Sequence, residues 1–176
     1  MFDNGERAYI DISDKFYYED AISEFEQAIK LERKDFYSWY SLGFIYLRSV
    51  NHIDIKKAID ALERFVHYAR AEAVQRNNQP LKLKLEDAYL MLAEAHYLLK
   101  EPKDAIKWTD KCTNNKEKAL LMKVKYLSFI ASSETKNEAA TILRDLLMQN
   151  PFLSLQVLED ADIIQNDCIK KKMKKL

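Results

Sequence analysis

The feature that most constrains this chain is an apolar stripe that recurs with the period of an α-helix. The segment 18–31 has apolar residues at i, i+1, i+4, i+7 and i+8, namely Ala21, Ile22, Phe25, Ala28 and Ile29. This spacing places them on one face of a helix, with charged residues on the other. Only two glycines and three prolines occur in 176 residues, too few for the turns of an all-β protein. The sequence therefore predicts an all-α fold.

Breaks in the stripe divide the chain into antiparallel helix pairs joined by short turns. The segment 75–80, QRNNQP, is expected to be a loop because Pro80 disfavours helix in the residue before it. We expect helices over about 18–31, 36–47, 55–75, 85–96, 102–112, 116–132, 136–149 and 153–159, and from about 162 to the end.

One of the two glycines, Gly43, lies inside a segment that otherwise predicts a helix buried on several sides. A glycine in a helix costs about 1 kcal/mol relative to alanine. We therefore predict that Gly43 faces a neighbouring helix at closest approach, where a side chain would hold the two backbones apart. Counted from Phe36, the residues Trp39, Leu42, Gly43 and Tyr46 have the spacing W-x2-L-G-x2-Y.

This spacing resembles the first helix of a tetratricopeptide repeat (TPR), and the chain is similar to bacterial-type TPR-containing proteins. The resemblance covers about residues 8–153. In the same frame, small residues and a closing proline take the repeat positions held by Ala58, Ala93, Ala105, Ala139 and Pro151. The resemblance implies a right-handed superhelix of about four TPR-like hairpins over residues 1–153, with repeats at about 2–35, 36–79, 86–119 and 120–153. Capping helices with a lysine-rich end would follow over 154–176.

In TPR proteins the first helices of the repeats line a concave groove. The resemblance implies that the groove of this chain would be lined mostly by aromatic and aliphatic residues. Exposed apolar surface of this kind marks binding sites. The groove positions are Tyr37, Tyr40, Ser41, Phe44, Leu47, Arg48, Leu90, Met91, Glu94, Tyr97, Lys125 and Ser128.

The resemblance thus implies a non-catalytic scaffold for protein–protein interaction, which binds a peptide or an amphipathic helix of another protein. One alternative is a small TPR-type chaperone for an exported or aggregation-prone partner. Another is that the groove is closed, because neighbouring repeats or the C-terminal tail pack into it. An enzyme or a nucleic-acid binder would need a polar cluster in the groove.

Charge and composition exclude several classes of function. Lysines plus arginines equal aspartates plus glutamates, 28 of each, so no overall field attracts nucleic acid or a membrane. The run KKKMKK at 170–175 is expected to be a solvated helix end. No apolar run is long enough for a membrane span, and the N-terminus has no signal-peptide pattern. We expect a cytoplasmic protein with Cys112 and Cys168 as free thiols.

Motifs of catalysis and metal binding are missing from the sequence. His52, His67 and His96 are isolated from other ligand-type residues at metal-binding spacing. Neither a phosphate-binding glycine loop nor a nucleophile elbow occurs. We therefore expect no catalytic residues, no cofactor, no metal and no small-molecule substrate.

Overall fold

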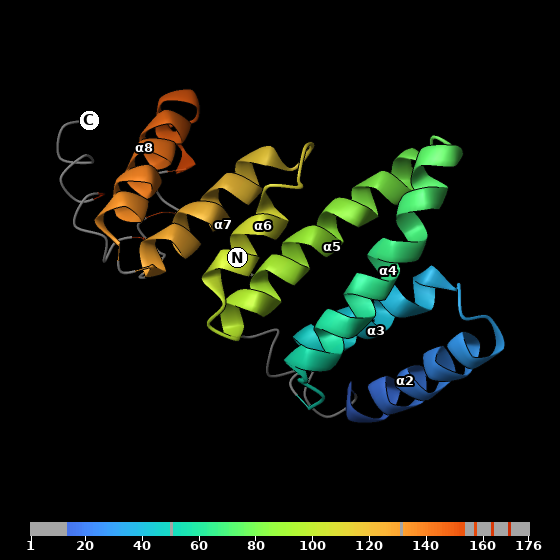
Figure 1. The fold of residues 1–176 in the computed structure, drawn as a ribbon. Helices are drawn as coiled ribbons and strands as arrows, with labels where there is room; N and C mark the ends of the chain where they lie inside the picture. Colours follow the sequence, from blue (N-terminus) through green and yellow to red (C-terminus); the bar gives the residue numbers. More distant parts are fainter. Residues whose placement is uncertain are drawn as a thin grey trace. The chain divides into compact units, whose positions relative to one another are not determined.

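The computed structural model of the chain describes residues 14–49, 51–130, 132–153, 157, 163 and 169. Within these residues every regular element of four residues or more is a helix, which confirms the all-α prediction (Figure 1). The order is α2 (Asp14–Leu31), α3 (Phe36–Arg48), α4 (Ile55–Gln75), α5 (Gln79–Leu98), α6 (Pro102–Thr109), α7 (Lys116–Phe129) and α8 (Ser133–Gln149). The residues cluster into two compact units, Met1–Ala95 and His96–Leu176.

Helices α3 and α4 each follow an aspartate and keep the predicted bounds within one residue. Asp54 precedes α4, and its side chain accepts a hydrogen bond from the Lys57 backbone N–H at 3.0 Å. Before α3, the Asp35 carboxylate accepts a 2.6 Å hydrogen bond from the Ser38 hydroxyl. Both carboxylates also lie at the positive end of a helix dipole.

The connection between α4 and α5 differs from the predicted loop at 75–80. Only residues 76–78 lie outside helices, and α5 begins at Gln79, the residue before Pro80. The Asn78 side chain accepts a 3.1 Å hydrogen bond from the Leu81 N–H, so it caps the new helix. Asn77 adopts a left-handed conformation with φ of 46°, which reverses the chain in a short turn. Pro80 therefore starts a helix rather than extending a loop.

Helices α3 and α4 form a hairpin whose centre is Gly43. This glycine is buried, and a Cβ built on it would lie 2.5 Å from Cγ and 2.7 Å from Cδ2 of Leu62 on α4. Leu62 is itself fully buried, and Ala58 and Ala61 beside it are small and buried. The prediction that Gly43 sits at the closest approach of two helices is confirmed.

The second unit has its own apolar core between α7 and α8. Val124 and Leu127 of α7 meet the buried face of α8 formed by Ala139, Ala140, Leu143, Leu146 and Leu147. Leu153, Val157, Ile163 and Ile169 belong to the same cluster. The other predictions for 154–176, including the lysine run and Cys168, lie outside the described residues, as do those for 1–13. Helix α7 ends at Phe129, three residues before the predicted end at 132, and α8 begins at Ser133, three residues before the predicted start at 136.

Candidate functional site

Helices α3 and α5 lie side by side and run in the same direction in the first unit. Near the start of α3, the Tyr40 ring has the Lys84 ammonium 4.5 Å from its centroid. Two turns later, the terminal guanidinium nitrogens Nη1 and Nη2 of Arg48 donate to the two carboxylate oxygens of Glu94. The contact later in α3 is made with a residue later in α5, so the two helices run parallel. A bidentate arginine–carboxylate pair fixes their register better than a single contact does.

One side of α3 carries two exposed aromatic residues, Tyr37 and Phe44, with the half-buried Tyr40 and Ser41 between them. We call these four residues the α3 aromatic face. Tyr37 and Phe44 are 49% and 44% exposed and lie seven residues apart, so they share one side of the helix. Tyr40 and Ser41 between them are half-buried. The Tyr40 ring packs edge-on against the buried Phe65 of α4 at 5.1 Å. The face is therefore anchored to the core through Tyr40.

Three predicted groove residues of the first unit have buried side chains: Leu47, Leu90 and Met91. They pack inside the unit and offer no surface to a partner, so they do not belong to the candidate site. Arg48 and Glu94 keep partly exposed side chains but are occupied by each other. What remains accessible on this side is the α3 aromatic face.

The other predicted groove residues, Tyr97, Lys125 and Ser128, belong to the second unit. The Tyr97 ring lies 4.7 Å from the Tyr126 ring and 5.5 Å from the Phe129 ring. The Lys125 ammonium is 5.5 Å from the Tyr97 ring centroid, and Ser128 is half-buried. Tyr97 therefore joins the end of α5 to α7 through an aromatic cluster.

Residues of the repeat motif occupy contact positions between helices. Trp39 is half-buried and Pro151 is exposed. All the others are buried, namely Leu42, Gly43, Tyr46, Ala58, Ala93, Ala105 and Ala139. Small residues at these positions let helices approach each other closely. The assignment to the TPR family stays a prediction.

Burial and a neighbouring carboxylate change the acidity of Tyr40. Desolvation first, and then the charge of Asp87 on α5, raise the pKa of Tyr40 above its usual value of 10.0. The neutral phenol is therefore favoured in the folded chain relative to the unfolded one. The contribution of the neutral Tyr40 phenol to the free energy of unfolding is fully present below about pH 10. It is lost as the pH rises through the folded-state pKa of Tyr40.

We expect the Tyr40→Phe variant to lose stability less steeply than the wild type between pH 9 and 11, because phenylalanine cannot ionise (about 10 is the usual tyrosine pKa). Urea unfolding at both pH values measures the difference. The exposed Tyr37→Phe variant is the control, and equal slopes for Tyr40→Phe and wild type would contradict this assignment.

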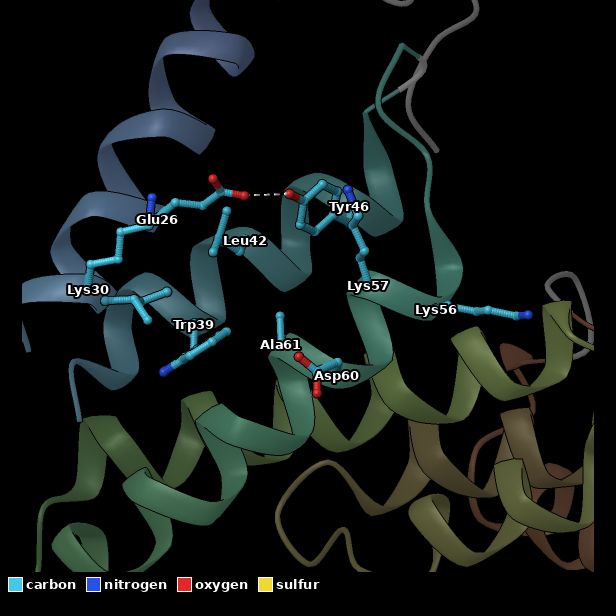
Figure 2. Close-up of a pocket in the computed structure, with 10 residues that line it drawn as sticks. Glu26, Lys30, Trp39, Leu42, Tyr46, Lys56, Lys57, Asp60 and Ala61 are labelled. Carbon is cyan, nitrogen blue, oxygen red and sulfur yellow. Dashed lines mark hydrogen bonds between the residues drawn. The ribbon is translucent and has the colours of Figure 1, made fainter. Parts of the chain in front are cut away.

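A second feature of the first unit is a pocket between α2, α3 and α4, with a volume of about 460 Å³ (Figure 2). Its apolar lining comes from all three helices: Ile29, Trp39, Leu42 and Ala61. The Trp39 indole is held in place on two sides. Its Nε1 donates to the Arg33 carbonyl at 3.1 Å, and the Arg64 guanidinium lies 5.0 Å from its ring centroid.

Charged groups stand around the opening of this pocket. Its polar lining consists of Glu26, Lys30, Tyr46, Lys56, Lys57 and Asp60. The Tyr46 hydroxyl donates to the Glu26 carboxylate at 3.4 Å, and the Lys57 ammonium lies 5.3 Å from the Tyr46 ring centroid. Desolvation, followed by the Glu26 charge, raises the pKa of Tyr46. Asp60 forms an ion pair with Arg64 at 2.9 Å.

The sequence analysis did not identify this pocket. Its residues come from three segments of the chain with no common motif, and only the packing of α2 against α3 and α4 brings them together. The W-x2-L-G-x2-Y motif supplies Trp39, Leu42 and Tyr46 to its wall, which was the one available signal.

Two further titratable side chains, His96 and Cys112, belong to the second unit. His96 Nδ1 lies 2.8 Å from a Glu101 carboxylate oxygen, in the turn between α5 and α6. Cys112 is buried. Across the described ranges, histidine, cysteine and acidic side chains form no group of three or more that could hold a metal ion. Among the same residues, no helix has both the length and the apolar character required to cross a membrane.

Comparison with known proteins gives no relative: no protein-family model, no curated protein and no solved structure matches this chain.

Proposed function

We propose that the chain is a non-catalytic protein-interaction module and that the α3 aromatic face is its contact surface. The observation that carries the proposal is the exposure of Tyr37 and Phe44 two turns apart on a helix whose other side is buried. Aromatic residues are enriched at protein interfaces and provide much of the binding energy there.

The arrangement of helices in the first unit supports a TPR-like reading of this surface. Helices α3 and α4 form a tight hairpin around Gly43. The first helix of the next predicted repeat, α5, runs parallel to α3 and contacts it through Tyr40–Lys84 and Arg48–Glu94. First helices that lie side by side in parallel are what a stack of hairpins requires.

The chemistry of the face indicates its partner. Tyr37 and Phe44 offer two apolar contact points, and Lys84 and Asp87 near Tyr40 add one charge of each sign. A peptide or amphipathic helix with apolar side chains at i and i+3, i+4 or i+7 could place one on each aromatic residue. A partner bound mainly by charge would find little to hold on this face.

Selection of peptides tests the proposal directly. A random peptide library displayed on phage is selected against the purified chain, and the affinity of each enriched peptide is measured by fluorescence anisotropy. We expect enriched peptides to carry spaced apolar residues. The Tyr37→Ser plus Phe44→Ser variant should bind them at least about tenfold more weakly with unchanged helicity, because removal of interface aromatic residues commonly has effects of that size or more.

The matched control is Phe152→Ser, which removes an aromatic residue that is 85% exposed in the second unit. This variant should bind the peptides like the wild type. Equal affinity of the peptides for the Tyr37 and Phe44 double variant would contradict the proposal, and so would failure of the library to yield any peptide that prefers the wild type.

A further inference from the structure

The pocket between α2, α3 and α4 has the dimensions and lining of a small-molecule site. Ligand pockets commonly enclose about 300–1,000 Å³ and have mostly apolar walls with a few polar groups. This one has a volume of about 460 Å³. Its inner wall is formed by Leu42, Ala61 and Trp39, of which the first two are buried side chains. The indole of Trp39 provides a flat surface for a planar or extended apolar group.

The charges at the opening favour a negative ligand. Figure 2 shows Lys30 of α2 and Lys57 of α4 reaching, from opposite sides, toward the end of the pocket where Glu26 meets Tyr46. No ion pair holds either lysine among the described residues. Glu26 lines the pocket at this end, and its carboxylate already accepts the Tyr46 hydroxyl. The Asp54 carboxylate also acts on Tyr46 but does not line the pocket. The other acidic residue of the lining, Asp60, is neutralised by Arg64.

We propose that this pocket binds an amphiphilic organic anion, with its apolar body against Trp39 and Leu42 and its anionic group between Lys30 and Lys57. The site is distinct from the α3 aromatic face and does not depend on the proposed function. The sequence analysis expected no small-molecule substrate, and the ligand inferred here is bound rather than transformed.

Two dyes that differ in one charged group test the inference. The probe is 8-anilino-1-naphthalenesulfonate, and its uncharged counterpart N-phenyl-1-naphthylamine lacks only the sulfonate. The Trp108→Phe background leaves Trp39 as the single tryptophan, since the chain has two. We expect the sulfonate dye to bind saturably and quench Trp39 emission by energy transfer. It should bind more tightly than the neutral dye at low salt, and the difference should fall as salt rises.

Four glutamine substitutions then separate the proposed site from general dye adsorption. Lys30→Gln and Lys57→Gln should each lower the affinity for the sulfonate dye by about threefold, the size expected for a partly exposed ion pair. Glu26→Gln should raise this affinity by a similar factor, because it removes the carboxylate nearest the anion. Lys56→Gln is the matched control: Lys56 also lines the pocket but points away from Trp39 in Figure 2, so its loss should change little.

Circular dichroism of each variant confirms that helicity is kept. The inference is overturned if the two dyes bind equally, if Trp39 emission does not respond, or if Lys56→Gln weakens binding as much as Lys30→Gln and Lys57→Gln. It is also overturned if Glu26→Gln lowers the affinity for the sulfonate dye, because a site for an anion would gain affinity from that change.

Discussion

Replacing Phe65 by alanine is expected to lower the free energy of unfolding by about 4 kcal/mol, within the range for truncating a buried aromatic residue. Phe65 is fully buried in α4, and its ring lies 6.3 Å from that of Phe36 and 5.1 Å from that of Tyr40. Truncation removes these contacts and leaves a cavity beneath α3. Urea unfolding followed by circular dichroism measures the loss.

Two further variants make the Phe65 result specific. Phe65→Leu keeps most of the side-chain volume and should cost less than about 2 kcal/mol. Phe129→Ala removes an aromatic residue that is 49% exposed and should cost less than Phe65→Ala. If Phe65→Ala and Phe129→Ala cost the same, Phe65 would not be the centre of the α3–α4 core.

Gly43→Ala is expected to destabilise the chain by about 2 kcal/mol, although alanine is the better helix former by about 1 kcal/mol. The new Cβ would lie 2.5 Å from Leu62 Cγ, and Leu62 is fully buried, so it has little room to move. In a Leu62→Ala background the opposing side chain is gone, so the effect of Gly43→Ala on the free energy of unfolding should change from a loss to a gain. There Gly43→Ala should stabilise by about 1 kcal/mol through helix propensity.

The four proteins of this double-mutant cycle are compared by urea unfolding. Leu62→Ala alone should be destabilised by several kcal/mol, in the range of about 2–5 for a buried leucine. A Gly43→Ala cost that is the same in both backgrounds would mean that contact with Leu62 is not the reason for glycine at this position.

Local sequence signals predicted much of the fold. The bounds of α3 and α4 followed from apolar periodicity and from the breaks in it, because these signals act within one helix. The close approach at Gly43 followed from the cost of glycine in a helix. The error came at Pro80, which the sequence analysis assigned to a loop. A proline disfavours helix before it but also suits the first turn of a helix, and the Asn78 cap decides between the two.

The candidate sites were predicted less completely than the helices. Exposure on α3 and α5 depends on how the two helices are rotated against each other, which involves residues such as Arg48 and Glu94 that lie 46 positions apart. Periodicity within one helix therefore could not distinguish the exposed Phe44 from the buried Leu47 and Met91. The pocket depends on the packing of three helices, and no spacing within any one of them reports it.

The division between the two compact units falls between Ala95 and His96, inside the continuous helix α5. Proteases cut extended, exposed chain far more readily than helix, so limited digestion should have no easy cleavage point at this division. To express the two halves separately, the chain is best divided in the turn at 99–101, because this keeps α5 whole in the first fragment. The second fragment would then lose His96 and Tyr97, and with Tyr97 the ring that packs on Tyr126. Helix α5 thus supplies side chains to both units, and a division of the chain after α5 removes its last side chains from the second unit.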